Sequence, residues 1–229
     1  MSLYSAFDQN NHFSELTAPL YHGPSGVISA ATRQATAVAN LGITASIADL
    51  NAIAGVGAPD TLTTEAGAGI TNNTGGGSYS SAVTQVGNII TTTIFIDVDG
   101  LDSSTTDLDV IGFDEATDLA AHLGQITTAQ NGVIFEGSMT CVEAPTGGVT
   151  DIDLYSGDDG TAVFDAAIST ETGERILLTS GGAWTAGRTL QLGIVPGPDQ
   201  YLYLTCGAGG TVAEYTAGQF YITLRGIAA

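Results

Sequence analysis

Carboxylates are the side chains in this sequence whose number and spacing could most readily do chemistry, because carboxylate oxygens bind calcium. The run DVDGLDSSTTDLD places Asp97, Asp99 and Asp102 around a glycine turn, and oxygen donors near a turn are what Ca²⁺ requires. The run does not fit an EF-hand loop, because its glycine comes three residues after the first Asp and its twelfth position is Leu108. We favour a polar strand end and turn, with a calcium site as the alternative.

A second group of carboxylates lies in the run DIDLYSGDDG. Asp151 and Asp153 alternate with apolar residues, and this alternation places both carboxylates on the solvent face of a strand. Asp158 and Asp159 follow in a turn. The same two interpretations apply, and we predict that neither group is a metal site.

Nucleophilic catalysis finds no support in the sequence. His12 and His22 lie in an irregular N-terminal stretch, and His122, beside a strong strand signal, is predicted to be a surface or interface residue. No histidine lies near a G-x-S-x-G motif, and there is no C-x-x-C, H-E-x-x-H or phosphate-binding glycine loop. Cys141 and Cys206 have no basic neighbours that would activate a thiolate. We therefore predict no catalytic residue, no cofactor and a protein that is not an enzyme.

The two cysteines each end an apolar alternation. A pair of buried thiols is the favoured state, and a disulfide between paired strands is the alternative.

The rare basic and aromatic residues have two possible uses each. The arginines, namely Arg33, Arg175, Arg188 and Arg225, could each form a bidentate pair with a carboxylate, within the chain or across a subunit contact. Trp184, the single tryptophan, lies in the loop-like stretch SGGAWTAG. It is predicted either to cover one end of the fold or to contact a partner.

The charge balance excludes several classes of partner. The chain of 229 residues has 24 acidic residues against four arginines and no lysine, for a formal net charge of −20. Nucleic acids and anionic membranes bind through basic groups, so neither is an expected partner. No apolar run reaches the length of a membrane span, and the first residues lack the features of a signal peptide.

The elements that position these residues are mostly strands, and the clearest lies between Asn131 and Glu143. Its alternation predicts one polar face with Glu136, Ser138 and Thr140, and one apolar face. The residues predicted on the apolar face are Val133, Phe135, Gly137, Met139 and Cys141. We interpret this segment as the central core strand.

Further strand signals recur at intervals of about 8 to 14 residues, which is typical of an all-β domain. They include a long signal through 82–98, with Ile94, Ile96 and Val98 on one face, and the stretches LDVIGF, DIDLYS, TAVFDAAI, ERILLTS, TLQLGIV, QYLYLTC and QFYITLRG. The predicted fold is a jelly-roll-like or Ig-like β-sandwich over 82–229.

The preceding residues are predicted to form two other parts. Residues 1–58 have scattered apolar side chains and two short helical patterns, 29–40 and 46–55, which suits an arm that docks on another subunit. Residues 59–81 are rich in glycine and poor in bulky side chains, which predicts a linker.

Two stretches resemble known proteins. LGITASIADLNAIAG, residues 41–55, resembles a segment of tailed-phage virion structural and fibre proteins, G-[IV]-T-A-x-x-x-x-L-N-x-[LI]-x-G, matched by Gly42, Ile43, Thr44, Ala45, Leu50, Asn51, Ile53 and Gly55. Relatives often end this segment with Asp-Gly, where this chain has Ala54-Gly55. From Thr92 onward, AHLGQIT, MTCVEAP and YLYL with YTAG are similar to small β-structured virion proteins of phages of marine and freshwater bacteria, including cyanophages.

The resemblance implies a non-enzymatic virion protein of the capsid decoration, or cement, type. Such a protein would bind the major capsid protein on the outer surface of the head and would form homotrimers. The alternative is a head or tail fibre module that recognises host-surface glycan. A third option, a secreted adhesion or carbohydrate-binding domain, would require a signal peptide.

Overall fold

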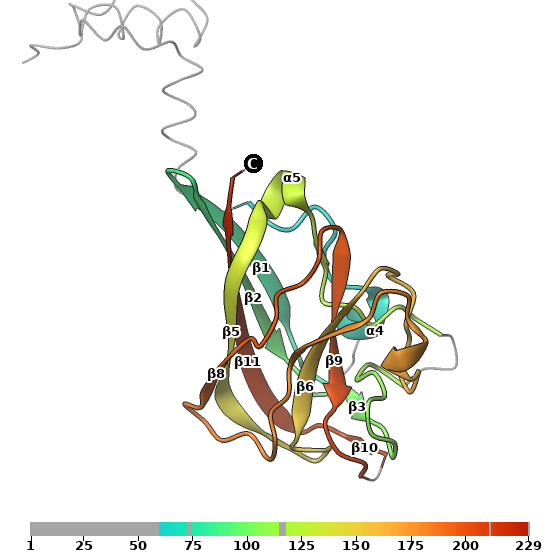
Figure 1. Cartoon of the computed structure of the whole chain (residues 1–229). Helices are drawn as coiled ribbons and strands as arrows, with labels where there is room; N and C mark the ends of the chain where they lie inside the picture. Colours follow the sequence, from blue (N-terminus) through green and yellow to red (C-terminus); the bar gives the residue numbers. More distant parts are fainter. Residues whose placement is uncertain (1–59, 73–74, 115–117, 211, 229) are drawn as a thin grey trace, which may run out of the picture. The chain divides into compact units, whose positions relative to one another are not determined.

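Two antiparallel β-sheets face each other in the computed structural model, which describes residues 60–72, 75–114, 118–210 and 212–228 (Figure 1). The five-stranded sheet has the order β1 (Tyr79–Val86), β2 (Ile89–Asp97), β11 (Ala217–Ile227), β5 (Val133–Thr146) and β8 (Thr189–Gln191). The four-stranded sheet has the order β4 (Gln125–Ile126), β9 (Gln200–Cys206), β6 (Ile152–Gly157) and β7 (Arg175–Leu178). The predicted all-β sandwich is confirmed.

The smaller elements lie outside the two main sheets. β3 (Asp102–Ser103) pairs with β10 (Ala213–Glu214), and each of the helices α4 (Ala68–Thr71), α5 (Thr128–Asn131) and η2 (Ile168–Thr170) is a single turn. The hydroxyl of Thr127 caps α5 by accepting a hydrogen bond from the backbone N–H of Gln130.

The long strand signal through 82–98 is in fact a hairpin. β1 and β2 pair in register from Tyr79 with Ile96 to Val86 with Ile89, and Gly87 and Asn88 form the two-residue loop. Gly87 has a positive φ of 61°, which glycine adopts without steric cost at the first position of a tight hairpin loop. The inward residues of β2 are buried along its whole length, as the alternation predicted.

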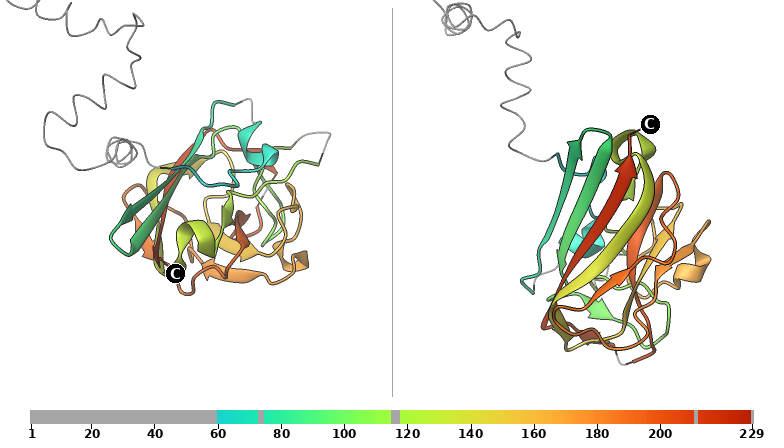
Figure 2. Two further views of the ribbon diagram at one scale, coloured as in Figure 1. Left: turned by 90° about the horizontal axis from the view of Figure 1, so that it is seen from above. Right: turned by 60° about the vertical axis from the view of Figure 1, so that its left-hand side comes forward.

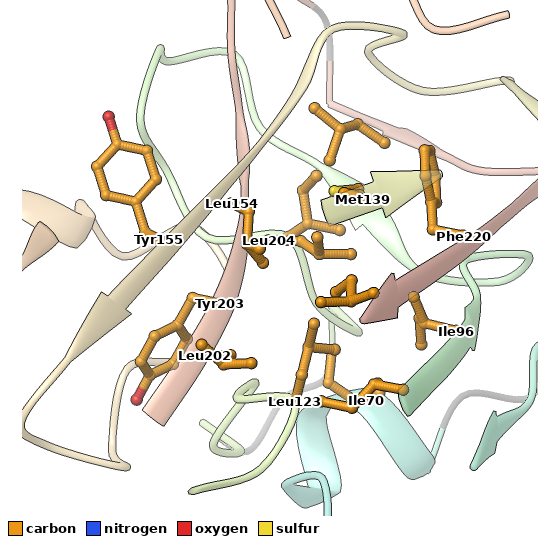
Figure 3. Close-up of a cluster of buried hydrophobic side chains, with 14 of the residues drawn as sticks. Ile70, Ile96, Leu123, Met139, Leu154, Tyr155, Leu202, Tyr203, Leu204 and Phe220 are labelled. Atoms are coloured by element: carbon orange, nitrogen blue, oxygen red, sulfur yellow. The ribbon is translucent and has the colours of Figure 1, made fainter. Parts of the chain in front are cut away.

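The core lies between the two sheets and is formed by alternate residues of their strands (Figure 3). Met139 and Phe220 of the five-stranded sheet face Leu154 and Leu204 of the four-stranded sheet, and all four are fully buried. Tyr203 points to the other side of its sheet, where its hydroxyl donates to the carbonyl of Asp159 over 2.5 Å. Both faces of the inner strands β9 and β6 are therefore covered.

The central strand signal corresponds to β5, but its two predicted faces are only partly right. Arg225 pairs with Glu136 and Gly226 with Ile134, so Phe135 is an extra residue in a β-bulge. Because of the bulge, the residues of β5 that precede Glu136 point to the opposite faces from those that a regular alternation predicts. Val133 and Phe135, predicted inside, are 59% and 44% exposed, and Ile134 packs against the core instead.

The glycine-rich segment between Asp60 and Ser81 packs against the sandwich, contrary to the predicted linker over 59–81. Leu62 and Ile70 are buried, and Asp60 bridges to Val83 of β1. Gly67 is required by close approach, because a Cβ at this position would lie 2.1 Å from the carbonyl oxygen of Ala120. Glycines that predicted flexibility instead allow two backbones to touch.

Other predictions fall outside the named strands or the described residues. LDVIGF and TAVFDAAI form isolated bridges, including Val110 with Thr205 and Ala120 with Val163. The predicted arm 1–58, with its helices 29–40 and 46–55 and the phage-like segment 41–55, lies outside the described residues.

Candidate interaction surface

Two carboxylates of the first group, Asp97 and Asp102, accept hydrogen bonds from different partners. The Asp97 carboxylate accepts hydrogen bonds from the Asp99 backbone N–H over 3.2 Å and from the Gln219 amide over 2.9 Å. Asp102 accepts from the Asp114 backbone N–H over 3.0 Å, and burial raises its pKa. Across the parts of the chain that the structure describes, no three or more His, Cys, Asp or Glu side chains are grouped to hold a metal ion.

The second carboxylate group is divided between the two ends of β6. Asp151 and Asp153 lie at its start, where the backbone N–H of Ser180 donates to Asp153 over 2.7 Å and the Ser180 hydroxyl contacts Asp151. Asp153 was predicted to face solvent, but it is only 4% exposed, because β6 is an inner strand buried on both faces. Desolvation raises its pKa. Asp158 lies beyond the other end and accepts from Gln200.

The histidine and the two cysteines among the described residues are buried. His122 was predicted to be a surface or interface residue, but it is 7% exposed within its own chain, with its ring edge against Tyr201 and its Nδ1 accepting from the Gly124 N–H over 3.2 Å. Burial lowers the pKa of His122. His12 and His22 lie outside the described residues.

Both cysteines are free and fully buried, as the favoured prediction stated. Burial raises the pKa of Cys141, and it raises the pKa of Cys206 to about 11. A thiol in such surroundings stays protonated at neutral pH, and only the thiolate is a good nucleophile.

Two of the described arginines, Arg188 and Arg225, bind groups of their own chain. Arg188 donates to the carbonyls of Ser180, Gly182 and Ala183, and its guanidinium lies 5.2 Å from the ring centre of Trp184. Arg225 forms an ion pair with Glu136 over 2.5 Å. The intrachain use of an arginine is therefore confirmed for Arg225, and Arg33 lies outside the described residues.

Trp184 is a core residue and neither a surface lid nor an exposed contact. It is 2% exposed, and its ring packs edge-on against Phe220 with centroids 5.5 Å apart. Its indole N–H donates to the carbonyl of Ile152 over 2.7 Å. A loop residue thereby joins the two sheets.

A cavity of about 320 Å³ lies beside the four-stranded sheet. Its lining combines the rings of Phe113 and Phe164 with the carboxylates of Asp114, Asp118 and Asp165. None of its lining residues is a histidine, cysteine, serine or arginine.

The five-stranded sheet turns one side away from the core, and this side is called here the outer face (Figure 2, right). Side chains that point away from the core form rows across its strands. One row is wholly apolar. Val86 pairs with Ile89, Ile89 with Ile227, and Ile227 with Val133, so the row crosses four strands at one end of the sheet.

Aromatic rings lie further along the same face. Tyr221 contacts Phe95 with ring centroids 5.6 Å apart, and Arg225 lies 5.6 Å from the ring centre of Phe135. Between these groups the rows consist of small hydroxyl-bearing side chains, including Thr93 opposite Thr223 and Thr223 opposite Ser138.

Exposed apolar side chains concentrate on this sheet. Nine large hydrophobic residues are prominently exposed among the described residues, and six of them belong to its strands. These six are Val86, Val133, Phe135, Val142, Tyr221 and Ile227. Sequence analysis missed the set, because the bulge at Phe135 reverses the alternation and places Val133 and Phe135 outside.

The outer face is also poor in charge. The five strands contain three carboxylates, Asp97, Glu136 and Glu143, and the one arginine among them, Arg225, pairs with Glu136. The apolar row contains no charged residue. On a chain with a formal net charge of −20, such an area is suited to contact with another macromolecule.

No helix among the described residues is long and apolar enough to cross a membrane.

Comparison with known proteins gives no relative. No protein-family model, curated protein or solved structure matches this chain.

Proposed function

We propose that this chain is a non-enzymatic structural protein of a phage virion, of the decoration type that binds the outside of the head. The proposal rests on the outer face, an apolar and nearly neutral surface on an otherwise acidic sandwich. A protein with such a surface acts by contact. In the part of the chain that the structure describes, His122, Cys141 and Cys206 are enclosed in the core.

The virion part of the proposal is supported by the resemblance of residues 41–55, and of the stretches from Thr92 onward, to tailed-phage structural proteins. A decoration protein needs no chemistry. It stabilises a shell by mass action, because it binds the assembled lattice more tightly than the separate subunits. The acidic surface would keep unbound copies in solution.

The alternative, a fibre module that recognises host glycan, needs exposed aromatic side chains. Trp184 cannot serve, because it is buried, but Tyr221 and Phe135 are each 44% exposed. These two side chains would be the stacking platforms of such a module.

Antibody-gold labelling of intact virions of the phage or prophage that encodes this chain tests the proposal, with virions from a deletion of the gene as the control. Label spread evenly over the head, and absent from the deletion virions, is the expected result. Label confined to the tail or to one vertex would favour the fibre alternative. Intact virions that bind no more label than the deletion control would contradict the proposal.

A further inference from the structure

We propose that the outer face binds a second copy of this chain, with the apolar row formed by Val86, Ile89, Ile227 and Val133 at the centre of the contact. The contact concerns the purified chain alone. The proposal therefore goes beyond the virion role and does not require it.

The charge distribution permits a second copy as the occupant and disfavours a basic partner. Two like charges 4 Å apart repel by about 1 kcal/mol in water and by about 4 kcal/mol near a protein surface. Two copies with a formal charge of −20 each can approach closely only where carboxylates are scarce. The outer face meets this condition, and a basic partner would instead be attracted to the acidic surfaces elsewhere.

The remaining charges of the outer face are arranged so that the apolar row stays neutral. Glu136 and Arg225, each nearly half exposed, neutralise each other next to this row. Asp97 and Glu143 pair with Gln219 in the register, at the opposite end of β11 from Ile227. A copy seated over Ile227 and Val133 therefore meets no unpaired carboxylate from the strands beneath it.

The apolar row provides the driving force for contact. Val86, Val133 and Ile227 are 81%, 59% and 47% exposed. Burying such side chains releases about 25 cal/mol for each Å² of apolar surface. Because the row is continuous across β1, β2, β11 and β5, it forms one patch that a second sheet can cover.

The rest of the outer face has the composition of a protein contact. Tyr, Phe and Arg are enriched at interfaces, and this face has Tyr221, Phe135 and Arg225 exposed side by side with short Thr and Ser side chains. Short side chains lose little conformational entropy on burial and let two sheets approach to about 10 Å.

Sedimentation velocity of the full chain over a range of concentrations tests this contact. Val133→Glu and Ile227→Glu each place a carboxylate in the apolar row. Ile176→Glu is the matched control, since Ile176 is 49% exposed on β7 of the other sheet. Circular dichroism verifies that all three variants fold, and Tyr221→Glu is a second probe if either of the first two does not.

The wild-type chain is expected to self-associate, and more tightly as salt screens the remaining repulsion. Each variant of the outer face is expected to raise the dissociation constant by roughly tenfold or more, which is the effect of losing an interface anchor. Ile176→Glu is expected to leave the dissociation constant unchanged.

A chain that is monomeric at every concentration and salt, or an oligomer equally sensitive to Ile176→Glu, would overturn the inference. Either result would leave the virion assignment to the gold-labelling experiment. Conversely, self-association through the outer face in a protein absent from virions would overturn only the proposed function.

Discussion

The indole N–H of Trp184 donates a hydrogen bond to the backbone carbonyl of Ile152 across 2.7 Å. This bond ties the loop before β8 to β6 in the four-stranded sheet, while the same ring packs against Phe220 of the five-stranded sheet. Trp184 thus holds the two layers together from one side.

Replacing Trp184 should destabilise the sandwich strongly. Trp184→Ala is expected to cost about 3–5 kcal/mol of unfolding free energy, the usual loss for a buried aromatic residue. Trp184→Phe is expected to cost about 1–3 kcal/mol, because the Ile152 carbonyl is left without its donor. Denaturant unfolding measures both, with the exposed Ile194→Ala as a control expected within about 0.5 kcal/mol of wild type. Equal stability of Trp184→Ala and wild type would contradict this role.

Burial of His122 should make the fold sensitive to mild acid. Because burial lowers its pKa in the folded state, the unfolded chain binds a proton first as the pH falls through about 6.5. The stability contributed by neutral His122 is therefore present above this pH and lost below it. Unfolding free energies of wild type and His122→Gln, compared between pH 7.5 and 5, should show a flatter profile for the variant. Parallel profiles would show that His122 does not titrate differently on folding.

Asp153 should act in the opposite direction. Its raised pKa means that the folded protein retains a proton that the unfolded chain loses above about pH 3.9. Stability linked to this group is therefore complete below that pH and declines as the pH rises toward the folded pKa. Asp153→Asn retains an acceptor for the Ser180 N–H and should unfold at a higher temperature than wild type at pH 7, but not at pH 3. Glu174→Gln removes the same charge from an exposed position and should show no such pH-dependent gain.

The two thiols should be inert until the protein unfolds. Cys141 and Cys206 are buried and unpaired, and burial raises the pKa of both. A thiol-specific chromogenic disulfide reagent at pH 8 is expected to label neither in the native protein and both in denaturant. Rapid labelling of the native chain would contradict their burial, and failure to label the unfolded chain would indicate a disulfide.

How far the sequence predicts this structure depends on whether a feature is local. The inward face of β2 followed from alternation, because Ile94 and Ile96 lie two residues apart on one strand. The bulge at Phe135 did not, since an extra residue in β5 is defined only by its partners on β11.

Long-range contacts account for the other differences. Gly67 lies in a stretch that was predicted to be a flexible linker. The prediction missed its close contact with Ala120, because Ala120 is distant in the sequence. Asp153 and His122 are of residue types that usually lie at the surface. They are buried because other segments of the chain fold over the four-stranded sheet. The outer face could be predicted in part, from Ile227 and Tyr221 on β11, but its completion by Val133 depends on the same bulge.

Hydroxyl-radical footprinting of the full chain at increasing concentration tests the contact through the outer face most directly. If this face binds a second copy, oxidation of Tyr221 and Phe135 will slow as the chain associates, while Ile176 and Ile194, exposed elsewhere, will react at a constant rate. Oxidation rates of Tyr221 and Phe135 that do not change with concentration, or protection of Ile176 and Ile194 in their place, would contradict the account.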